Sequence, residues 1–272
     1  MKLQEKLVKL REDKKAILAA NFYNLETLQA VVGAASDANT SIILQLSESS
    51  IKYIGLPMAV KMAKTALEAS GVEGWLHLDH GSNLKLVQDC LDAGFDSVMI
   101  DASEKPMEEN IRISAEAVML AESYGANVEA ELGFIAKLNQ QQQHSGFTQP
   151  EDALRFTGET GVNALAVSIG TAHGFYKEEP KLDIELLGRI RDAVDTPLVL
   201  HGSSGVPDSS IVLAIRNGIT KINLATETKN AFMQKLKSDL LSTDEIDLRI
   251  VFPSATEAAR ELIRNKLRVL AQ

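Results

Sequence analysis

The sequence predicts an α/β protein built as a single (β/α)8 TIM barrel, with one helix before the first strand and a helical tail after the last. Short, β-rich apolar runs recur eight times, and amphipathic segments with helical spacing lie between them. Several runs are almost continuously apolar, as expected for parallel strands buried on both faces. No Pro/Gly/Ser-rich linker interrupts the series, so residues 1–272 are expected to form one domain.

The elements follow one another in a regular order. The expected strands are residues 16–22, 41–47, 74–80, 97–103, 127–133, 164–170, 197–203 and 221–227. Four intervening helical segments end at a glycine, a common helix C-terminal signal: Gly71, Gly94, Gly125 and Gly161. The charged, amphipathic N-terminus predicts a helix, and the helical tail is expected from about Ala255. A doubly wound sheet is the rival fold, but no GxGxxG follows the first run.

Composition excludes several functional classes. The formal net charge of −9 argues against a nucleic-acid or anionic-membrane surface. No apolar run approaches the roughly 20 residues needed to span a bilayer, and no apolar signal segment is evident. The single cysteine, Cys90, allows no intrachain disulfide and is expected to be a small buried apolar residue. A cytoplasmic protein is expected.

In a barrel of this kind, functional side chains gather at the carboxyl ends of the strands. The polar residues at or just beyond these ends are Asn21, Ser47, Asp79, His80, Asp101, Glu129, Glu131, His173, His201, Asn223 and Thr226. Histidines follow the third, sixth and seventh strands, so a closed barrel brings them toward one point. Three imidazoles suit zinc and leave a fourth position open for substrate or water. The alternative is a set of hydrogen-bonded structural side chains with no metal.

The segment "HLDHGS" places two candidate roles on adjacent residues. His80 is expected to be a metal ligand and Asp79 an acid/base beside it, whereas His77 lies further back and is expected to be a core residue. Adjacent strand residues face opposite ways, so a bulge or turn is needed for both to work.

The segments "HGSSGVP" (201–207), after the seventh expected strand, and "NLATE" (223–227), in the eighth, are rich in small residues. Glycine allows backbone N–H groups to approach a phosphate, and Ser203, Ser204 and Thr226 supply hydroxyl donors nearby. The loops after strands seven and eight are the usual phosphate site in such barrels.

Several motifs together resemble the class II, metal-dependent ketose-bisphosphate aldolases over nearly the whole chain. They are "NFYNLETLQAVV", "HLDHG", "GFDSVMIDAS", "EENI", "VEAELG", "LAVSIGTAHGFY", "PKLD", "PLVLHGSSGVP" and "GITKINLATE". "GTAHG" and "NLATE" look closer to the tagatose-bisphosphate type than to the fructose-bisphosphate type.

The resemblance implies a fold, an activity and a set of site residues. It implies one zinc ion on His80, His173 and His201, an alternative metal position at Asp101 and Glu131, and a monovalent cation as a possible second cofactor. It implies Asp79 as proton donor to the C4 oxygen of a phosphorylated ketose, with Asn223 assisting. The substrate-binding residues that it implies are Asn21, Ser47, Gly174, Gly202, Ser203, Ser204, Asn223, Leu224, Ala225, Thr226 and Arg249.

Other mechanisms fit the sequence less well. A Schiff-base aldolase needs a lysine inside the barrel, and the only lysine in the expected strands, Lys221, stands at the start of the eighth. A metal hydrolase of the amidohydrolase type needs His-x-His on strand one, and "AILAANF" has none.

The loop after strand five departs from the family pattern. Where the family has two glycines and then an acid that moves the C3 proton, this chain has Ala136, Lys137 and Asn139. His144 could replace the acid, or Lys137 could bind an unusual anion, such as a sulfonate, at the far end of the substrate. A sugar-phosphate-binding protein with weak turnover is the remaining alternative. The resemblance also implies a homodimer or higher homo-oligomer, with Arg249 reaching toward the partner's site.

Overall fold

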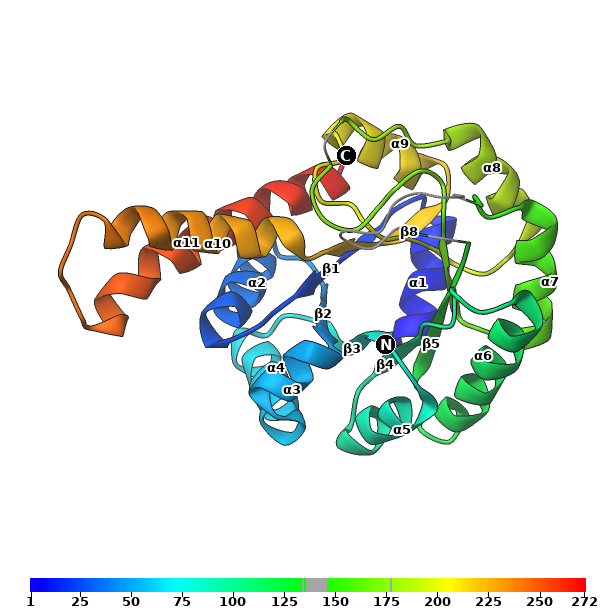
Figure 1. Ribbon diagram of the computed structural model, residues 1–272, viewed down its shortest axis with the longest axis horizontal. Helices are drawn as coiled ribbons and strands as arrows, with labels where there is room; N and C mark the ends of the chain where they lie inside the picture. The colour runs from blue at the N-terminus through cyan, green and yellow to red at the C-terminus, as the bar shows by residue number, and fades with distance from the viewer. Residues whose placement is uncertain (134, 136–145, 177) are drawn as a thin grey trace.

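The computed structural model describes residues 1–133, 135, 146–176 and 178–272, and its eight parallel strands close into a barrel (Figure 1). Each strand pairs with the next in the chain, and the last returns to the first. The strands are β1 (Ile17–Asn21), β2 (Ile42–Ser47), β3 (Gly74–Gly81), β4 (Ser97–Ile100), β5 (Asn127–Leu132), β6 (Ala164–Val167), β7 (Leu198–Leu200) and β8 (Ile219–Leu224). The predicted (β/α)8 barrel is confirmed.

Helices surround this barrel and close one of its ends. They are α1 (Leu3–Glu12), α2 (Leu25–Asp37), α3 (Glu48–Ile54), α4 (Leu56–Ser70), α5 (Leu84–Ala93), α6 (Met107–Glu122), α7 (Pro150–Thr160), α8 (Ile184–Ala193), α9 (Asp208–Arg216), α10 (Thr226–Leu240) and α11 (Leu248–Leu270). Asparagine caps begin two of them, since Asn24 and Asn83 accept hydrogen bonds from backbone N–H groups three residues on. Left-handed Gly71, Gly94 and Gly161 end α4, α5 and α7, as predicted, whereas α6 ends at Glu122, before the expected Gly125.

The barrel interior changes from apolar at its floor to polar at its mouth. The floor is a cluster that includes Ile17, Ile43 and Trp75, and Leu3 and Leu7 of α1 pack into it. Further along the strands, the inward positions carry polar and charged side chains: Asn21, Gln45, His77, Asp79, Glu129, Glu131, Lys221 and Asn223. Helix α1 therefore closes the floor and leaves the mouth as the end with chemistry.

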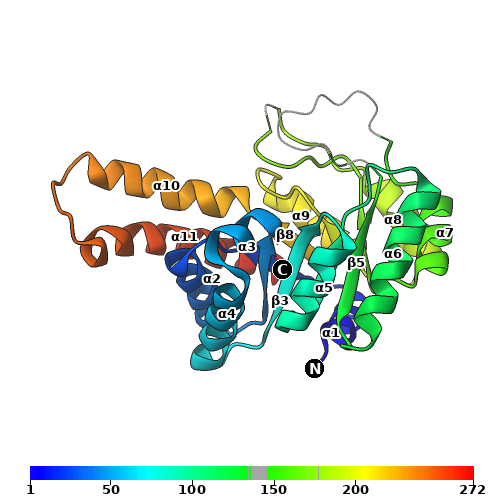
Figure 2. The ribbon, with the colours of Figure 1, turned by 60° about the horizontal axis from the view of Figure 1, so that its bottom comes forward.

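The C-terminal part of the chain forms an antiparallel helical hairpin. Figure 2 shows α10 and α11 side by side, extending from the barrel. The helical tail begins at Leu248, earlier than the expected Ala255, because the helix continues through Pro253, which removes only one backbone donor. Among the described residues, no helix is both long enough and apolar enough to cross a membrane.

Candidate active site

The end of β3 turns two adjacent side chains toward the mouth of the barrel. His80 has a backbone φ of 51°, and the pairing of β3 with β4 shifts register between Leu78 and Gly81. A left-handed backbone at a histidine is uncommon and costs about 1–3 kcal/mol, which the surrounding contacts must offset. This irregularity is the bulge that the sequence required for Asp79 and His80 to face the same site.

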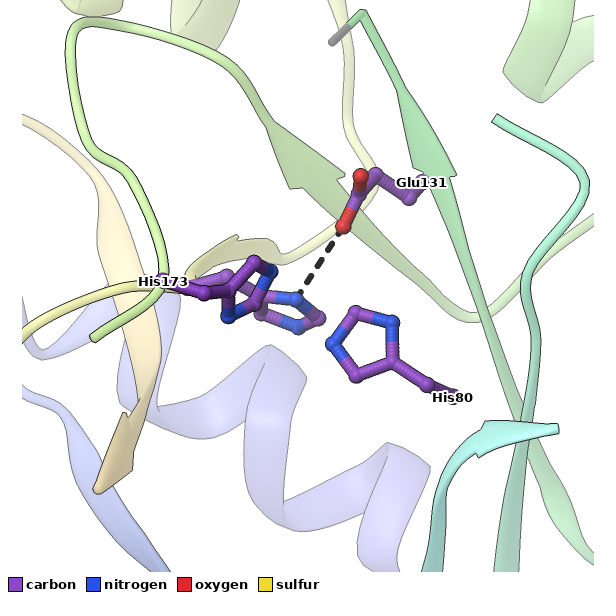
Figure 3. A group of neighbouring side chains, drawn as sticks. His80, Glu131 and His173 are labelled. Carbon is purple, nitrogen blue, oxygen red and sulfur yellow. Dashed lines mark ion pairs between the residues drawn. The ribbon is translucent and has the colours of Figure 1, made fainter. Parts of the chain in front are cut away.

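Three histidines and one carboxylate converge beside this bulge. His80, His173, His201 and Glu131 each offer one ligand atom, and these atoms all lie within 4.8 Å of one another. The His80 ring centroid lies 5.0 Å from that of His173 and 4.8 Å from that of His201. Figure 3 shows His80, His173 and Glu131 turned toward a common point. The predicted convergence of the three histidines is therefore present in the structure.

The facing atoms of this cluster fit a divalent metal ion. His80 Nε2, His173 Nε2, His201 Nδ1 and Glu131 Oε2 are buried, and none has a hydrogen-bond partner among the described residues. Glu131 Oε2 lies 3.1 Å from His201 Nδ1, near enough to attract it electrostatically. Buried polar atoms are rarely left unpaired, and three imidazoles with a carboxylate nearby are a donor set that zinc accepts.

Carboxylates behind two of the histidines fix their orientation. Asp101 Oδ2 lies 2.8 Å from His80 Nδ1, and Glu129 Oε1 lies 2.8 Å from His201 Nε2. Such contacts select the ring nitrogen that faces the metal. The expected alternative position thus divides: Glu131 lies in the histidine cluster, while Asp101 supports His80 and bonds to Ser103.

Asp79 is held by two asparagines. Asn21 Nδ2 donates to one carboxylate oxygen at 2.8 Å, and Asn223 Nδ2 donates to the other at 3.3 Å. Gln45 in turn donates to Asn21 Oδ1 at 3.0 Å. The carboxylate of Asp79 is therefore oriented from both sides within a buried site.

The charges of the site are strongly coupled. Burial opposes ionisation of Asp79, but His80 and His201 lower its pKa below the usual value. Burial and the neighbouring histidines lower the pKa of His173 to about 3. Burial also opposes protonation of His201, yet its hydrogen bond to Glu129 and the charge of the nearby Glu131 carboxylate raise its pKa to about 9. Metal binding must therefore displace a proton from His201.

The loops after β7 and β8 lie against each other. Gly202 has φ of 65°, and a Cβ there would lie 2.4 Å from the carbonyl oxygen of Ala172, so only glycine fits. Ser203 Oγ donates to the Asn223 carbonyl at 2.5 Å, and the backbone N–H of Glu227 donates to Ser204 Oγ at 3.3 Å.

The remaining predicted substrate residues differ in what they expose. Gly174 also has positive φ, at 96°. Leu224 is buried in the apolar core, which leaves its backbone as the part that could meet a ligand. Ala225 is the N-cap position of α10, and Thr226 is its first residue. Ser47 lies opposite Asp79 in the β2–β3 pairing and caps α3.

Some predicted site residues are not gathered at the mouth within this chain. Arg249 is 90% exposed at the start of α11 and is paired with Asp247. Lys137, Asn139 and His144 lie outside the described residues.

Sequence reasoning misplaced one residue and missed the role of two others. Lys221 is the third residue of β8, not its first, and its side chain is fully buried inside the barrel. Its partners are Glu129 and Asn223, and Gln45 supports Asn21 on the opposite side. Lys221 and Asn223 are two residues apart on one strand, as are Glu129 and Glu131, so each pair faces the same side of the sheet. This spacing is the sequence signal that could have placed Lys221 and Glu129 inside the barrel.

A closed barrel with a histidine cluster at its mouth is the arrangement of a barrel enzyme whose site could hold a metal ion. The whole chain, residues 1–272, matches the family described as fructose-bisphosphate aldolase class-II. The protein therefore belongs to the class II fructose-bisphosphate aldolase family. It is an aldolase, a lyase of a metal-dependent family whose substrates are phosphorylated sugars.

Solved structures support this placement. The YdjI aldolase from Escherichia coli K12 is 32% identical with a TM-score of 0.89, and the match covers 98% of this chain and 96% of that one. A protein from Coccidioides immitis is 28% identical with a TM-score of 0.91, over 99% and 96% of the two chains. Fructose-bisphosphate aldolase from Campylobacter jejuni, at 23% identity and a TM-score of 0.83 over 99% and 94%, shares the fold.

Proposed function

We propose that the protein is a zinc-dependent aldolase that reversibly cleaves a ketose 1-phosphate or ketose bisphosphate, of the fructose- or tagatose-1,6-bisphosphate type. Its products would be dihydroxyacetone phosphate and an aldehyde such as glyceraldehyde 3-phosphate. The observation that carries the proposal is the set of unpartnered, convergent imidazole nitrogens of His80, His173 and His201 beside Asp79. Three histidine ligands with an open position favour zinc.

The protein's own groups supply the proton transfer at C4. When bound, zinc would act as a Lewis acid on the oxygens of the substrate. In cleavage, the Asp79 carboxylate accepts the proton of the C4 hydroxyl while the C3–C4 bond breaks, and it returns that proton in condensation. Asn223 carries a second N–H besides the one that faces Asp79, and this N–H can stabilise the developing enediolate charge.

The loops after β7 and β8 support binding of the C1 phosphate. The α10 N-terminus offers backbone N–H groups and a favourable dipole at Thr226. Gly202, Ser203 and Ser204 lie beside it, because Ser203 and Ser204 bond to the backbone at Asn223 and Glu227. Asn21, Ser47 and Gly174 would bind the rest of the sugar.

The sequence of the loop after β5 favours a second candidate substrate. Asn139 cannot titrate, so we propose His144 for the C3 proton, and Lys137 as the contact of a different anion at C6. That reading makes the substrate a modified ketose phosphate, such as a sulfonate. A sugar-phosphate-binding protein with weak turnover is the alternative that the missing acid supports.

Retro-aldol assays on a panel of ketose phosphates test these proposals. Fructose and tagatose 1,6-bisphosphates, their 1-phosphates and a 6-sulfonated ketose 1-phosphate would be assayed for dihydroxyacetone phosphate. We expect cleavage of at least one, loss of activity on chelation and recovery with zinc. Binding without turnover across the panel would favour the binding protein, and chelator-resistant cleavage would contradict the metal mechanism.

We also propose a homodimer or higher homo-oligomer formed through the hairpin of α10 and α11. Its connecting end exposes apolar side chains, with Leu241 and Ile246 each 90% exposed and Leu248 61% exposed. Apolar groups this exposed favour a protein partner. Arg249 lies at the same end of the hairpin and is 90% exposed. In the proposed assembly, its guanidinium would lie near the partner chain and not at the mouth of its own barrel.

A further inference from the structure

Lys221 is a charged residue sealed inside the barrel below the proposed site. Its side chain is 0% exposed, and its ammonium lies 2.8 Å from Glu129 Oε2, whose side chain is also 0% exposed. Besides this ion pair, the ammonium donates a hydrogen bond, at 2.8 Å, to Asn223 Oδ1. A buried ammonium is costly unless it is paired in this way, and full burial keeps it from attacking a substrate carbonyl.

The bond from Lys221 to Asn223 determines which way the asparagine amide points. An amide can present either its oxygen or its NH2 group on a given side. With Oδ1 held by Lys221, Nδ2 faces Asp79 Oδ1 at 3.3 Å and therefore faces the mouth. Without this cation, the long bond to Asp79, at 3.3 Å, would be the remaining described contact that holds the amide in this orientation.

The ion pair with Glu129 reaches the metal cluster by a second route. Glu129 Oε2 meets Lys221, and Oε1 lies 2.8 Å from His201 Nε2. In the neutral imidazole, a carboxylate at this distance keeps the proton on Nε2, which leaves the lone pair on Nδ1. His201 Nδ1 has no hydrogen-bond partner among the described residues and belongs to the convergent cluster, with Glu131 Oε2 3.1 Å away.

We propose that Lys221 is a positioning residue that orients two parts of the site at once: the Asn223 amide toward the reacting atoms, and, through Glu129, the His201 Nδ1 lone pair toward the metal. This proposal rests on the proposed aldolase function. Lys221 is fully buried and does not belong to the convergent cluster, so it would act through its two partners, Asn223 and Glu129.

Two variants separate positioning from charge compensation. Lys221→Met leaves Glu129 buried and unpaired, whereas Lys221→Met/Glu129→Gln removes both charges and keeps an oxygen that accepts from His201. Thr220→Val is the matched control, because Thr220 is a buried neighbour on β8 whose hydroxyl donates to the Leu198 carbonyl, on the side away from the described site residues' hydrogen bonds. Readouts are kcat and KM at saturating zinc, zinc affinity by chelator competition, melting temperature and affinity for a hydroxamate analogue of the three-carbon enediolate.

For Lys221→Met we expect kcat to fall about 100-fold with little change in KM, because a charge-stabilising donor is lost. Zinc affinity should fall roughly 10-fold or more, because support of a ligand is lost. In the double variant, melting temperature and zinc affinity should recover, whereas kcat and hydroxamate affinity should stay low. Thr220→Val should lower only the melting temperature.

Recovery of kcat and hydroxamate affinity in the double variant would overturn the proposal, since Lys221 would then only neutralise Glu129. Wild-type zinc affinity in Lys221→Met would equally overturn its action on His201. If Lys221→Met fails to fold, the double variant still decides the action on Asn223. A wild-type protein that cleaves no ketose phosphate would refute the proposed function instead, and the zinc and hydroxamate affinities would still decide the role of Lys221.

Discussion

His80 illustrates how the site is set by single residues. Its left-handed backbone interrupts the alternation of β3, and Asp101 holds its ring from behind. A sequence pattern can show that Asp79 and His80 are adjacent polar residues at a strand end. It also indicates that a bulge or turn is needed, but it does not show where the register shifts, because the shift depends on how β4 pairs with β3.

At the residue scale, Asp79→Asn tests the proposed proton transfer. We expect kcat to fall by roughly 10²–10⁴-fold, because an amide cannot accept the C4 proton. Zinc content should stay at the wild-type level, since Asp79 does not belong to the convergent cluster. Steady-state kinetics with metal analysis would check this, and His173→Ala, which removes a cluster member, is the comparison that should lose zinc. An Asp79→Asn enzyme with near-normal kcat would exclude Asp79 as the base.

The site residues were predictable from sequence to differing degrees. His80, His173 and His201 follow strand ends, so closure of the barrel was enough to bring them together. Lys221 was wrongly expected at a strand start, because β8 begins two residues earlier, at Ile219. Its pairing with Glu129 is a contact across the barrel that no local pattern records.

At the element scale, apolar runs located all eight strands but not their ends. β4 ends at Ile100 and β6 at Val167, each three residues before the expected boundary. Apart from Asp101, the residues up to the expected boundaries are small or apolar, so the sequence pattern does not mark where these strands end. They leave the hydrogen-bonded ladder because the chain turns toward the mouth.

Helix α1 closes the floor of the barrel, and Leu7→Ala tests its contribution. Leu7 is 0% exposed in the cluster with Ile17 and Trp75, so the cavity should cost about 2–4 kcal/mol of unfolding free energy. Urea unfolding would measure it, with Val8→Ala, at a 46% exposed position of the same helix, as the control. kcat should be unchanged, because the floor lies at the opposite end from the histidines. Equal losses in both variants would contradict this packing role.

The hairpin of α10 and α11 tests the proposed assembly. Leu241→Asp and Ile246→Asp put charges on side chains that are each 90% exposed, so neither should unfold the monomer. We expect both to reduce the sedimentation mass toward that of one chain. Met119→Asp, at a 65% exposed position on α6, should leave the mass unchanged. Assembly that survives both hairpin variants would place the interface elsewhere.

At the scale of the whole molecule, the buried histidines predict how the stability of the metal-free protein depends on pH. Burial lowers the pKa values of His77 and His173 to about 3. Their contribution to the unfolding free energy is therefore fully present above pH 6.5 and is lost as the pH falls toward 3. Burial opposes protonation of His201, but Glu129 and Glu131 raise its pKa to about 9, so its contribution is present below 6.5 and is lost as pH rises toward 9.

We therefore expect the unfolding free energy of the metal-free protein to be greatest near pH 6.5. Urea titrations from about pH 4 to 9 would measure it. His201→Asn should remove the decline on the alkaline side. Stability that rises steadily from neutral to alkaline pH would contradict the assigned charge on His201.

The barrel interior changes from an apolar floor, with Leu7 and Trp75, to a polar mouth with the histidine cluster. The packing that stabilises the fold is therefore separated from the side chains of the candidate site. Replacements around the rim disturb few of the contacts on which the floor depends. A scaffold arranged in this way can tolerate many replacements without being rebuilt, and the Campylobacter jejuni enzyme has the same fold at 23% identity.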